Sequence, residues 1–240
     1  MVEYPNNVGN LNPPTKWNTL KEVRAPFEWL FGLCKFSNTS TFDKGDNRPL
    51  ILIPGYGADK WAMRPMKKLL NSVGYKVYDW GHGRNKGHVK TDTDKLAETT
   101  QGIFEKYDNQ QVTLIGWSLG GVLAREVARL NPDIVREVIT LGTPLIGGPK
   151  YTVIANKYAK SMKMDLNNYE EEIHAINSQG LSQPITVIYS KSDGVVGWKA
   201  SIDSYNDHAK NIEVKGSHLG LTVNSQVWKV IVNTLQNKTL

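Results

Sequence analysis

Residues 111–130 have the sequence QVTLIGWSLGGVLAREVARL, and this stretch decides the fold of the chain. Its first part is an apolar, β-branched run, and apolar side chains recur at helical spacing after Gly-Trp-Ser-Leu-Gly. The stretch therefore predicts a strand, a very tight turn and a helix, with Ser118 at the point of the turn. Glycines at 116 and 120 suit such a strained turn, because a Cβ at either position would collide with its neighbours. A serine held at a helix N-terminus, where free N–H groups favour negative charge, is a candidate nucleophile.

The pattern Gly-x-Ser-x-Gly is loose by itself, so its partners matter. A serine nucleophile needs a base that can take its proton near neutral pH, and histidine is the natural choice. Of the five histidines, only His218 lies in a glycine-flanked loop directly after a predicted strand. His174 falls in a predicted insertion, and His208 lies in a polar stretch before the last strand. We therefore predict that His218 is the base.

The imidazole in turn needs an acid that fixes its tautomer and stabilises the imidazolium. Asp193 follows a predicted strand, and Gly194 after it permits a sharp turn. Asp203 and Asp207 are expected to be solvent-exposed residues of a polar loop. The sequence thus predicts the acid at Asp193.

Strands and helices alternate along most of the chain, which predicts a parallel α/β sheet with right-handed crossovers. The residues before Ser118 supply one of the predicted strands. The other strands are predicted at 50–53, 75–80, 136–141, 184–190 and 211–214. Helices are predicted at 61–72, 95–107, 119–130 and 225–235. Ligands of such sheets bind beyond the carboxyl ends of the strands, where we expect Ser118, Tyr56 and Thr143. The glycine-rich loop at 54–59 could aim the Tyr56 amide at an anion there, although the loop taken alone favours an ordinary turn before the next helix.

Two segments depart from this alternation. Residues 146–183 contain two short helical patterns and are predicted to form a cap or lid that shapes the substrate pocket and opens and closes. Residues 1–49 are predicted to form an arm followed by an amphipathic helix over residues 20–36. That helix is expected to cover the sheet or its edge. The alternative is an interfacial lipid-binding helix with Phe27, Trp29, Leu30 and Phe31 facing a bilayer.

Composition narrows the class of protein. The 240 residues suit a single domain, and the net charge of +6 comes without a long Lys/Arg run or a nucleic-acid-binding signature. We expect no nucleic-acid partner, whereas weak contact with an anionic membrane surface stays open. The sequence leaves the oligomeric state undetermined.

Localisation and cofactors follow from a few residues. Residues 1–7 lack the basic start and apolar core of a secretory signal, and the single cysteine, Cys34, fits a reducing compartment. These observations predict a cytoplasmic protein, or a secreted one if a signal has been removed. His82 and His88 lack a third ligand of suitable spacing and are expected at the surface or a pocket edge. We predict no metal and no organic cofactor.

Five motifs, taken together, resemble the α/β-hydrolase superfamily from about residue 50 onward, and most closely its bacterial lipases and esterases. They are Pro-Gly-Tyr-Gly at 54–57, Gly-Trp-Ser-Leu-Gly-Gly at 116–121, Leu-Gly-Thr-Pro at 141–144, Ser-Asp-Gly-Val-Val at 192–196 and Gly-Ser-His-Leu-Gly at 216–220. The resemblance implies an α/β-hydrolase fold with a mostly parallel central sheet, reduced to about six strands, flanked by helices and carrying a small helical cap.

The resemblance also implies a triad of Ser118, His218 and Asp193, with the backbone N–H groups of Tyr56 and Leu119 as oxyanion donors. Pro54 stands where many lipases have a histidine, which is a departure from the pattern. The N-terminal helix has no counterpart in the resemblance.

The expected function is hydrolysis of small-molecule or lipid carboxylic esters through an acyl-enzyme. Three alternatives remain: a thioesterase or acyltransferase that uses the same triad, a non-catalytic ligand-binding member of the fold, and a protein that docks on a membrane or partner. Acyl-chain length and alcohol specificity are not encoded in any of these motifs.

Overall fold

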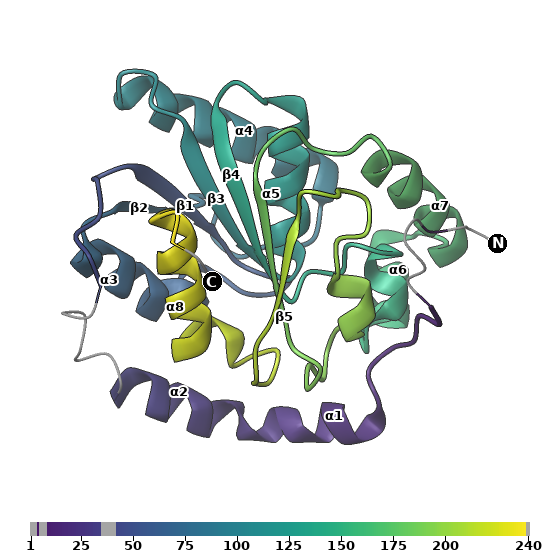
Figure 1. The fold of residues 1–240 in the computed structure, drawn as a ribbon. Helices are drawn as coiled ribbons and strands as arrows, with labels where there is room; N and C mark the ends of the chain where they lie inside the picture. Colours follow the sequence, from purple (N-terminus) through teal and green to yellow (C-terminus); the bar gives the residue numbers. More distant parts are fainter. Residues whose placement is uncertain (1–3, 5–8, 35–41, 239–240) are drawn as a thin grey trace.

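The structure is a computed structural model that describes Tyr4, residues 9–34 and residues 42–238 (Figure 1). The strands are β1 (Pro49–Ile53), β2 (Lys76–Asp79), β3 (Val112–Trp117), β4 (Val135–Leu141), β5 (Ile185–Tyr189) and β6 (Lys210–Glu213). The α-helices are α1 (Lys16–Lys21), α2 (Ala25–Cys34), α3 (Arg64–Val73), α4 (Val89–Lys106), α5 (Leu119–Leu130), α6 (Ala155–Met162), α7 (Leu166–Asn177) and α8 (Ser225–Leu235). Short 3₁₀ helices are η2 (Glu22–Arg24), η5 (Lys60–Met63), η6 (Gly148–Tyr151), η7 (Trp198–Ser201) and η8 (Leu221–Val223).

Within the described chain, one sheet of six strands has the order β2-β1-β3-β4-β5-β6, and every neighbouring pair is parallel. Parallel pairing brings all the carboxyl ends to one edge. At that edge Ile53 is paired with Gly116, and Trp117 is paired with Leu141. The sequence-based prediction of about six strands is confirmed, and the loops after β1, β3, β4, β5 and β6 all leave from the edge where we expected the site.

Helices cover both faces of the sheet (Figure 1). In β1, Leu50 and Leu52 belong to the apolar core shared with α3 and α8, whereas Ile51 and Ile53 belong to the core shared with α4 and α5. All four side chains are buried, and burial of a side chain of this size stabilises the fold by about 1.5–3 kcal/mol. The uninterrupted apolar run of β1 therefore reflects a strand enclosed on both sides.

Helices α5 and α8 have their predicted bounds, whereas α3 begins three residues late, after the 3₁₀ helix η5, and α4 begins early. Helix α3 ends at Gly74, which has a left-handed φ of 111° and donates its N–H to the carbonyls of Leu70 and Asn71. Helix α4 begins at Val89, about a turn and a half before the predicted start at Lys95. Its first turns carry mostly polar side chains, so the apolar periodicity that marks the rest of the helix is weak there.

The predicted cap consists of η6, α6 and α7 and lies beside the carboxyl edge of the sheet. Its first part is attached to the segment after β5, because Thr152 forms an isolated antiparallel bridge with Val196. Its last part is attached to the loop after β4, since the Asn177 side chain donates to the carbonyl of Leu145 at 2.9 Å.

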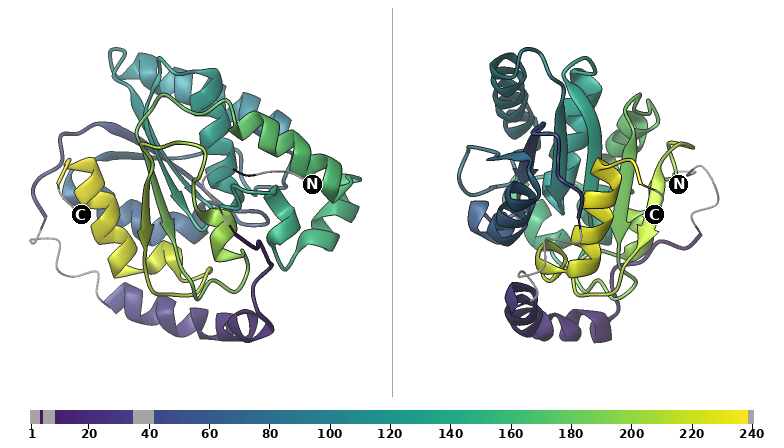
Figure 2. Two further views of the ribbon diagram at one scale, coloured as in Figure 1. Left: turned by 45° about the vertical axis from the view of Figure 1, so that its right-hand side comes forward. Right: turned by 60° about the vertical axis from the view of Figure 1, so that its left-hand side comes forward.

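The segment α1–η2–α2 runs along the carboxyl edge in Figure 1 and in both views of Figure 2. The sequence predicted a helix here, and a helical segment is present. Its apolar side chains, however, face away from the sheet: Leu20, Val23 and Phe27 are exposed. The segment lies along the edge of the sheet, which is one of the two places predicted, but it does so with these apolar side chains exposed. Among the described helices, none has both the length and the apolar composition needed to cross a membrane.

Candidate active site

Ser118 lies at the junction of β3 and α5, as predicted. Its φ of 54° and ψ of −125° are unusual for a residue with a side chain, and such strain is stored mainly at functional sites. The turn is held on both sides, because the Ser118 N–H donates to the carbonyl of Leu141 at 2.8 Å and its carbonyl accepts the N–H of Gly121 at 3.0 Å. Leu119 is the first residue of α5, so its N–H has no acceptor within the helix.

The glycines around Ser118 are required by close backbone packing. A Cβ at Gly116 would collide with the backbone of Gly120, and a Cβ at Gly120 would collide with the carbonyl of Ile53. The prediction that small residues are needed on both sides of the serine is confirmed. The tight packing brings the start of α5 against the end of β1, next to the loop that carries Tyr56.

Asp193 and His218 form a buried pair at the same edge. Asp193 follows β5 and His218 follows β6, and His218 Nδ1 lies 2.7 Å from Asp193 Oδ2. The other carboxylate oxygen, Oδ1, accepts the N–H groups of Val195 at 2.8 Å and Val196 at 2.7 Å. Because both of its oxygens are engaged, the Asp193 carboxylate holds the imidazole in one orientation. Nδ1 faces Asp193, and Nε2 is the ring nitrogen that Asp193 does not use.

The pKa of His218 is raised above its ordinary value. Burial opposes the charged form, but the nearby charge of Asp193, its hydrogen bond and the charge of Glu22 favour that form more strongly. An imidazole next to a fixed carboxylate is a stronger base than a free one. The pair is thus suited to accept a proton from a neighbouring hydroxyl.

Trp117, which directly precedes Ser118 in the chain, contacts His218 and so connects Ser118 with this pair. The indole of Trp117 lies 5.5 Å from the His218 ring, centroid to centroid, and its Nε1 donates to the His218 carbonyl at 3.2 Å. Among the described residues, which include both Ser118 and His218, no hydrogen bond joins the Ser118 hydroxyl to the His218 ring. In enzymes without substrate such bonds are often long, and they shorten when substrate binds.

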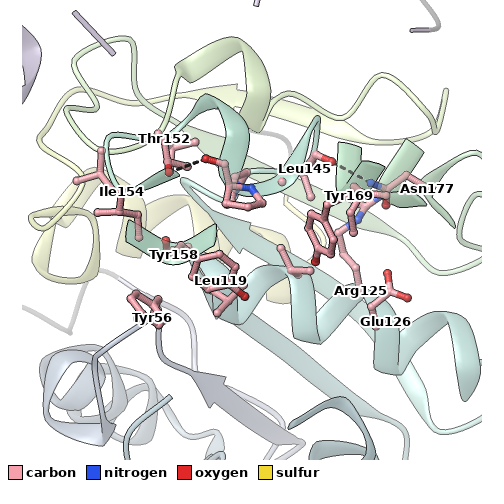
Figure 3. Close-up of a pocket in the computed structure, with 18 residues that line it drawn as sticks. Tyr56, Leu119, Arg125, Glu126, Leu145, Thr152, Ile154, Tyr158, Tyr169 and Asn177 are labelled. Carbon is pink, nitrogen blue, oxygen red and sulfur yellow. Dashed lines mark hydrogen bonds between the residues drawn. The ribbon is translucent and has the colours of Figure 1, made fainter. Parts of the chain in front are cut away.

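Tyr56 and Leu119 line the cavity that also contains Ser118 (Figure 3). The loop of Tyr56 passes close to the serine, because a Cβ built on Gly55 would lie 3.0 Å from Ser118 Cβ. In this loop the N–H of Gly57 is bonded to the Asn85 carbonyl, whereas the N–H of Tyr56 has no acceptor among the described residues. The amides of Tyr56 and Leu119 are therefore available as donors, and both residues line the cavity beside Ser118.

The cavity lies between α5 and the cap. Most of its lining is apolar or aromatic, and Figure 3 shows Tyr56, Leu119, Ile154 and Tyr158 around one part of it. Leu145, Tyr169 and Asn177 surround the other part, next to Arg125 and Glu126. A cavity with this apolar lining is chemically suited to the acyl or alcohol portion of an ester.

Arg125 and Asp203 form a buried ion pair next to the cavity. Their side chains are 1% and 0% exposed, and Arg125 Nη1 lies 2.6 Å from Asp203 Oδ2. Burial lowers the pKa of Arg125, and the Asp203 charge acts in the opposite direction. The prediction that Asp203 is solvent-exposed is wrong, because its polar sequence surroundings fold around the guanidinium. Asp207 is exposed, as predicted.

The remaining histidines lie apart from Ser118. His82 and His88 are exposed, which confirms their predicted place at the surface. His174 lies in α7 next to the hydroxyl of Tyr205, and His208 Nε2 lies 3.0 Å from the carbonyl of Gln183. Across the described parts of the chain, no three His, Cys, Asp or Glu side chains gather in the way a metal site requires.

Two glutamates of the N-terminal segment contact the loops of Asp193 and His218. The Glu22 carboxylate accepts the N–H groups of Gly194, His218 and Leu219 at 2.9, 2.7 and 3.1 Å. Glu28 accepts the hydroxyl of Ser217 at 2.5 Å. The segment thus ties together the two loops that carry the acid and the base.

Comparison with known proteins identifies the fold. A family model described as the alpha/beta hydrolase fold matches residues 48–163. The monoacylglycerol lipase of Paleococcus ferrophilus superposes with a TM-score of 0.59 at 17% identity, over 82% of this chain and 97% of that one. A metagenome-derived lipolytic enzyme superposes with a TM-score of 0.61 at 14% identity, over 82% of this chain and 96% of that one. This chain has the α/β-hydrolase fold.

Curated relatives match this chain over about half its length. Ethanol acetyltransferase 1 of Wickerhamomyces anomalus is 26% identical over 126 residues, which are 51% of this chain and 32% of that protein. The pimeloyl-[acyl-carrier protein] methyl ester esterase of Photobacterium profundum is 30% identical over 101 residues, which are 42% of this chain and 39% of that protein. The chain spans between about a third and about half of the length of such relatives.

Sequence analysis of this chain missed three features of the site. Glu22 and Glu28 lie in the predicted amphipathic helix and were given no role, since nothing local links them to the loops of Asp193 and His218. Gly142, in the Leu-Gly-Thr-Pro motif, has a φ of 53°, and a Cβ there would lie 2.9 Å from Asp193 Oδ2 and 3.0 Å from His218 Nδ1. The motif itself was the available signal for Gly142. The two glutamates had none.

Proposed function

We propose that this protein cleaves carboxylic esters by nucleophilic catalysis at Ser118. The observation that carries the proposal is the buried pair of His218 and Asp193 at the sheet edge where the strained Ser118 borders an apolar cavity. Each element has a separate chemical use: the serine attacks, the imidazole moves the proton, and the cavity holds the acyl or alcohol group.

In the proposed reaction, Ser118 Oγ attacks the ester carbonyl while His218 Nε2 takes the hydroxyl proton. Asp193 keeps the imidazole oriented and stabilises it once it is charged. The N–H groups of Tyr56 and Leu119 donate to the oxyanion, where one such donor is worth about 3 kcal/mol in comparable sites. His218 then returns its proton to the departing alcohol. Water, activated by the same imidazole, releases the acid from the acyl-enzyme.

The Ser118→Ala variant tests this proposal. We expect it to lose at least about 10⁴-fold in kcat for a nitrophenyl ester, because no other group replaces the nucleophile. The matched control is Ser72→Ala, since Ser72 lies in α3 and bonds only to the carbonyl of Leu69. Stoichiometric labelling by a fluorophosphonate should occur in wild type and in the control but not in Ser118→Ala. Undiminished hydrolysis by Ser118→Ala would reject the assignment.

A second candidate is transfer of the acyl group to an alcohol. The observation that favours it is the match to ethanol acetyltransferase 1. The apolar lining of the cavity also binds water weakly, which favours an alcohol as the acceptor. The chemistry up to the acyl-enzyme is the same, and only the acceptor differs. Product analysis with an ester in the presence of rising ethanol distinguishes the two, because a transferase gives the ethyl ester while water is in large excess. The same assay with a thioester substrate tests for thioesterase activity.

A further inference from the structure

The segment α1–η2–α2 has an apolar surface that points to solvent. Five of its large apolar side chains are each between 58% and 67% exposed, and they recur every three or four residues, which places them on one side. We name this surface the outer stripe. It consists of Trp17, Leu20, Val23, Phe27 and Leu30. Contiguous exposed apolar surfaces of this kind mark sites of interaction with proteins or membranes.

The opposite side of the segment is fixed to the molecule by polar contacts. Glu22 and Glu28 accept N–H and O–H groups from the loops after β5 and β6. Trp29 donates its Nε1–H to the Leu219 carbonyl at 3.1 Å, and Thr19 donates its hydroxyl to the Gly194 carbonyl at 2.9 Å. The outer stripe could turn inward only if all these bonds broke, so its exposure is a fixed property of the fold. Trp29 faces the protein, contrary to the alternative considered from sequence, in which it faced a bilayer.

Charge on the segment is divided in the same way. Both glutamates between residues 16 and 30 point inward and are engaged with the loops. Lys16 and Arg24 are exposed beside the outer stripe, and Lys21 lies with its Nζ 5.5 Å from the centre of the Trp17 ring. The side that meets solvent therefore combines apolar and cationic groups, while both carboxylates accept hydrogen bonds from the loops.

We propose that the outer stripe docks this protein on the surface of an anionic phospholipid membrane. An amphipathic helix lying in the interface inserts its apolar side below the headgroups, and its lysines and arginines contact lipid phosphates. A second copy of the chain is the less suitable occupant, because a symmetric contact of two outer stripes would bring their cationic borders together. Anionic lipid satisfies the apolar and the cationic residues at once.

Docking in this orientation turns the carboxyl edge of the sheet toward the lipid. The segment is bonded to Gly194 and His218, and Val195 and Val196 next to Gly194 line the cavity of Ser118. The candidate active site thus lies within a few residues of the docked surface. The docking itself needs no turnover and is independent of the proposed hydrolase activity.

Co-sedimentation with vesicles tests the docking. The full chain is mixed with vesicles of phosphatidylcholine alone or of phosphatidylcholine with phosphatidylglycerol. We expect wild type to pellet with the anionic vesicles and to bind the neutral ones more weakly, by about fivefold for each cation at the surface at low salt. Failure of wild type to pellet with anionic vesicles would overturn the proposal.

Two variants separate the apolar from the cationic contribution. The triple variant Leu20→Ser, Phe27→Ser, Leu30→Ser should bind anionic vesicles at least about tenfold more weakly, because three inserted side chains are lost. Lys16→Gln with Arg24→Gln should reduce the preference for anionic vesicles by about 25-fold, because two of the cations are lost. The matched control is Leu130→Ser, which removes a leucine that is 63% exposed at the end of α5. It should bind as wild type does.

Three readouts make the outcome decisive. Circular dichroism and hydrolysis of a soluble ester without vesicles should match wild type in the triple variant, since the outer stripe does not line the cavity. Ser118→Ala should bind vesicles normally, so loss of hydrolysis and loss of docking are distinguished. Unchanged vesicle binding by the triple variant would refute the assignment of the surface. Self-association that this variant abolishes, without vesicle binding by wild type, would assign the stripe to a second copy instead.

Discussion

Glu22→Gln tests whether the N-terminal segment holds the proposed catalytic loops in place. The carboxylate accepts three amides, from Gly194, His218 and Leu219, at 2.7–3.1 Å. A charged acceptor strengthens each bond by about 1 kcal/mol over a neutral one, and glutamine offers one acceptor oxygen in place of two. Part of this gain is screened, because the carboxylate is half-buried. We expect a loss of about 2 kcal/mol in the free energy of unfolding, which lowers the Tm by roughly 4–8 °C in a chain of this size.

The same variant changes the pH dependence of hydrolysis. The Glu22 charge is one of the causes that raise the pKa of His218, so its removal lowers that pKa. The neutral imidazole is the base and exists above the pKa. The rise of kcat/KM with pH should therefore occur at lower pH in Glu22→Gln than in wild type. A pH series with a soluble nitrophenyl ester, next to thermal unfolding, measures both effects.

Glu28→Gln is the matched control for this experiment. Glu28 lies on the same segment and bonds to Ser217, but the causes that shift the pKa of His218 are its burial, Asp193 and Glu22. The control should lose stability and keep the wild-type midpoint of the pH profile. The reasoning is refuted if Glu22→Gln keeps the wild-type Tm and profile, or if both variants move the midpoint equally.

Two further substitutions test the framework of the site. Asp203→Asn leaves the buried cation of Arg125 without its partner and should cost about 3–5 kcal/mol in unfolding free energy by urea titration, whereas the exposed control Asp207→Asn should change it by less than about 0.5 kcal/mol. Gly120→Ala should cost at least about 3 kcal/mol, because the new Cβ collides with the carbonyl end of β1. Gly102→Ala in α4 meets no atom within 4 Å and should stabilise the protein by about 0.5–1 kcal/mol. Equal effects of the two alanines would contradict the packing argument, and equal effects of the two asparagines would contradict the ion-pair argument.

Local pattern was enough for the elements that surround Ser118. Strand β3 is a continuous apolar run, and α5 follows with apolar side chains at helical spacing, so both were predicted close to their observed bounds. Gly116 and Gly120 indicated the tight turn, because no residue with a Cβ fits at either position. The pairing of His218 with Asp193 was predicted from their places after two strands. This worked because parallel strands end at a common edge.

Two local patterns gave the wrong expectation of burial. Asp203 lies in a polar stretch that is typical of a surface loop, yet it is buried against Arg125, which is seventy-eight positions away. The outer stripe has the spacing of a core-facing helix, yet it faces solvent. In both cases a contact distant in sequence outweighs the local preference: the guanidinium draws in the carboxylate, and three backbone amides hold Glu22 on the inner side.

The sequence alone determined the order of strands and helices, the elbow at Ser118 and the candidates for base and acid, because each depends on side-chain periodicity, on backbone sterics or on position after a strand. The tertiary structure alone decided which side of α1–η2–α2 meets the molecule, which carboxylates hold the loops of Asp193 and His218, and how the cap and α5 enclose the cavity. The physical reason is that hydrogen bonds and packing between distant segments depend on where the folded backbone places those segments. The spacing of residues along the chain does not show how close two such segments lie in space.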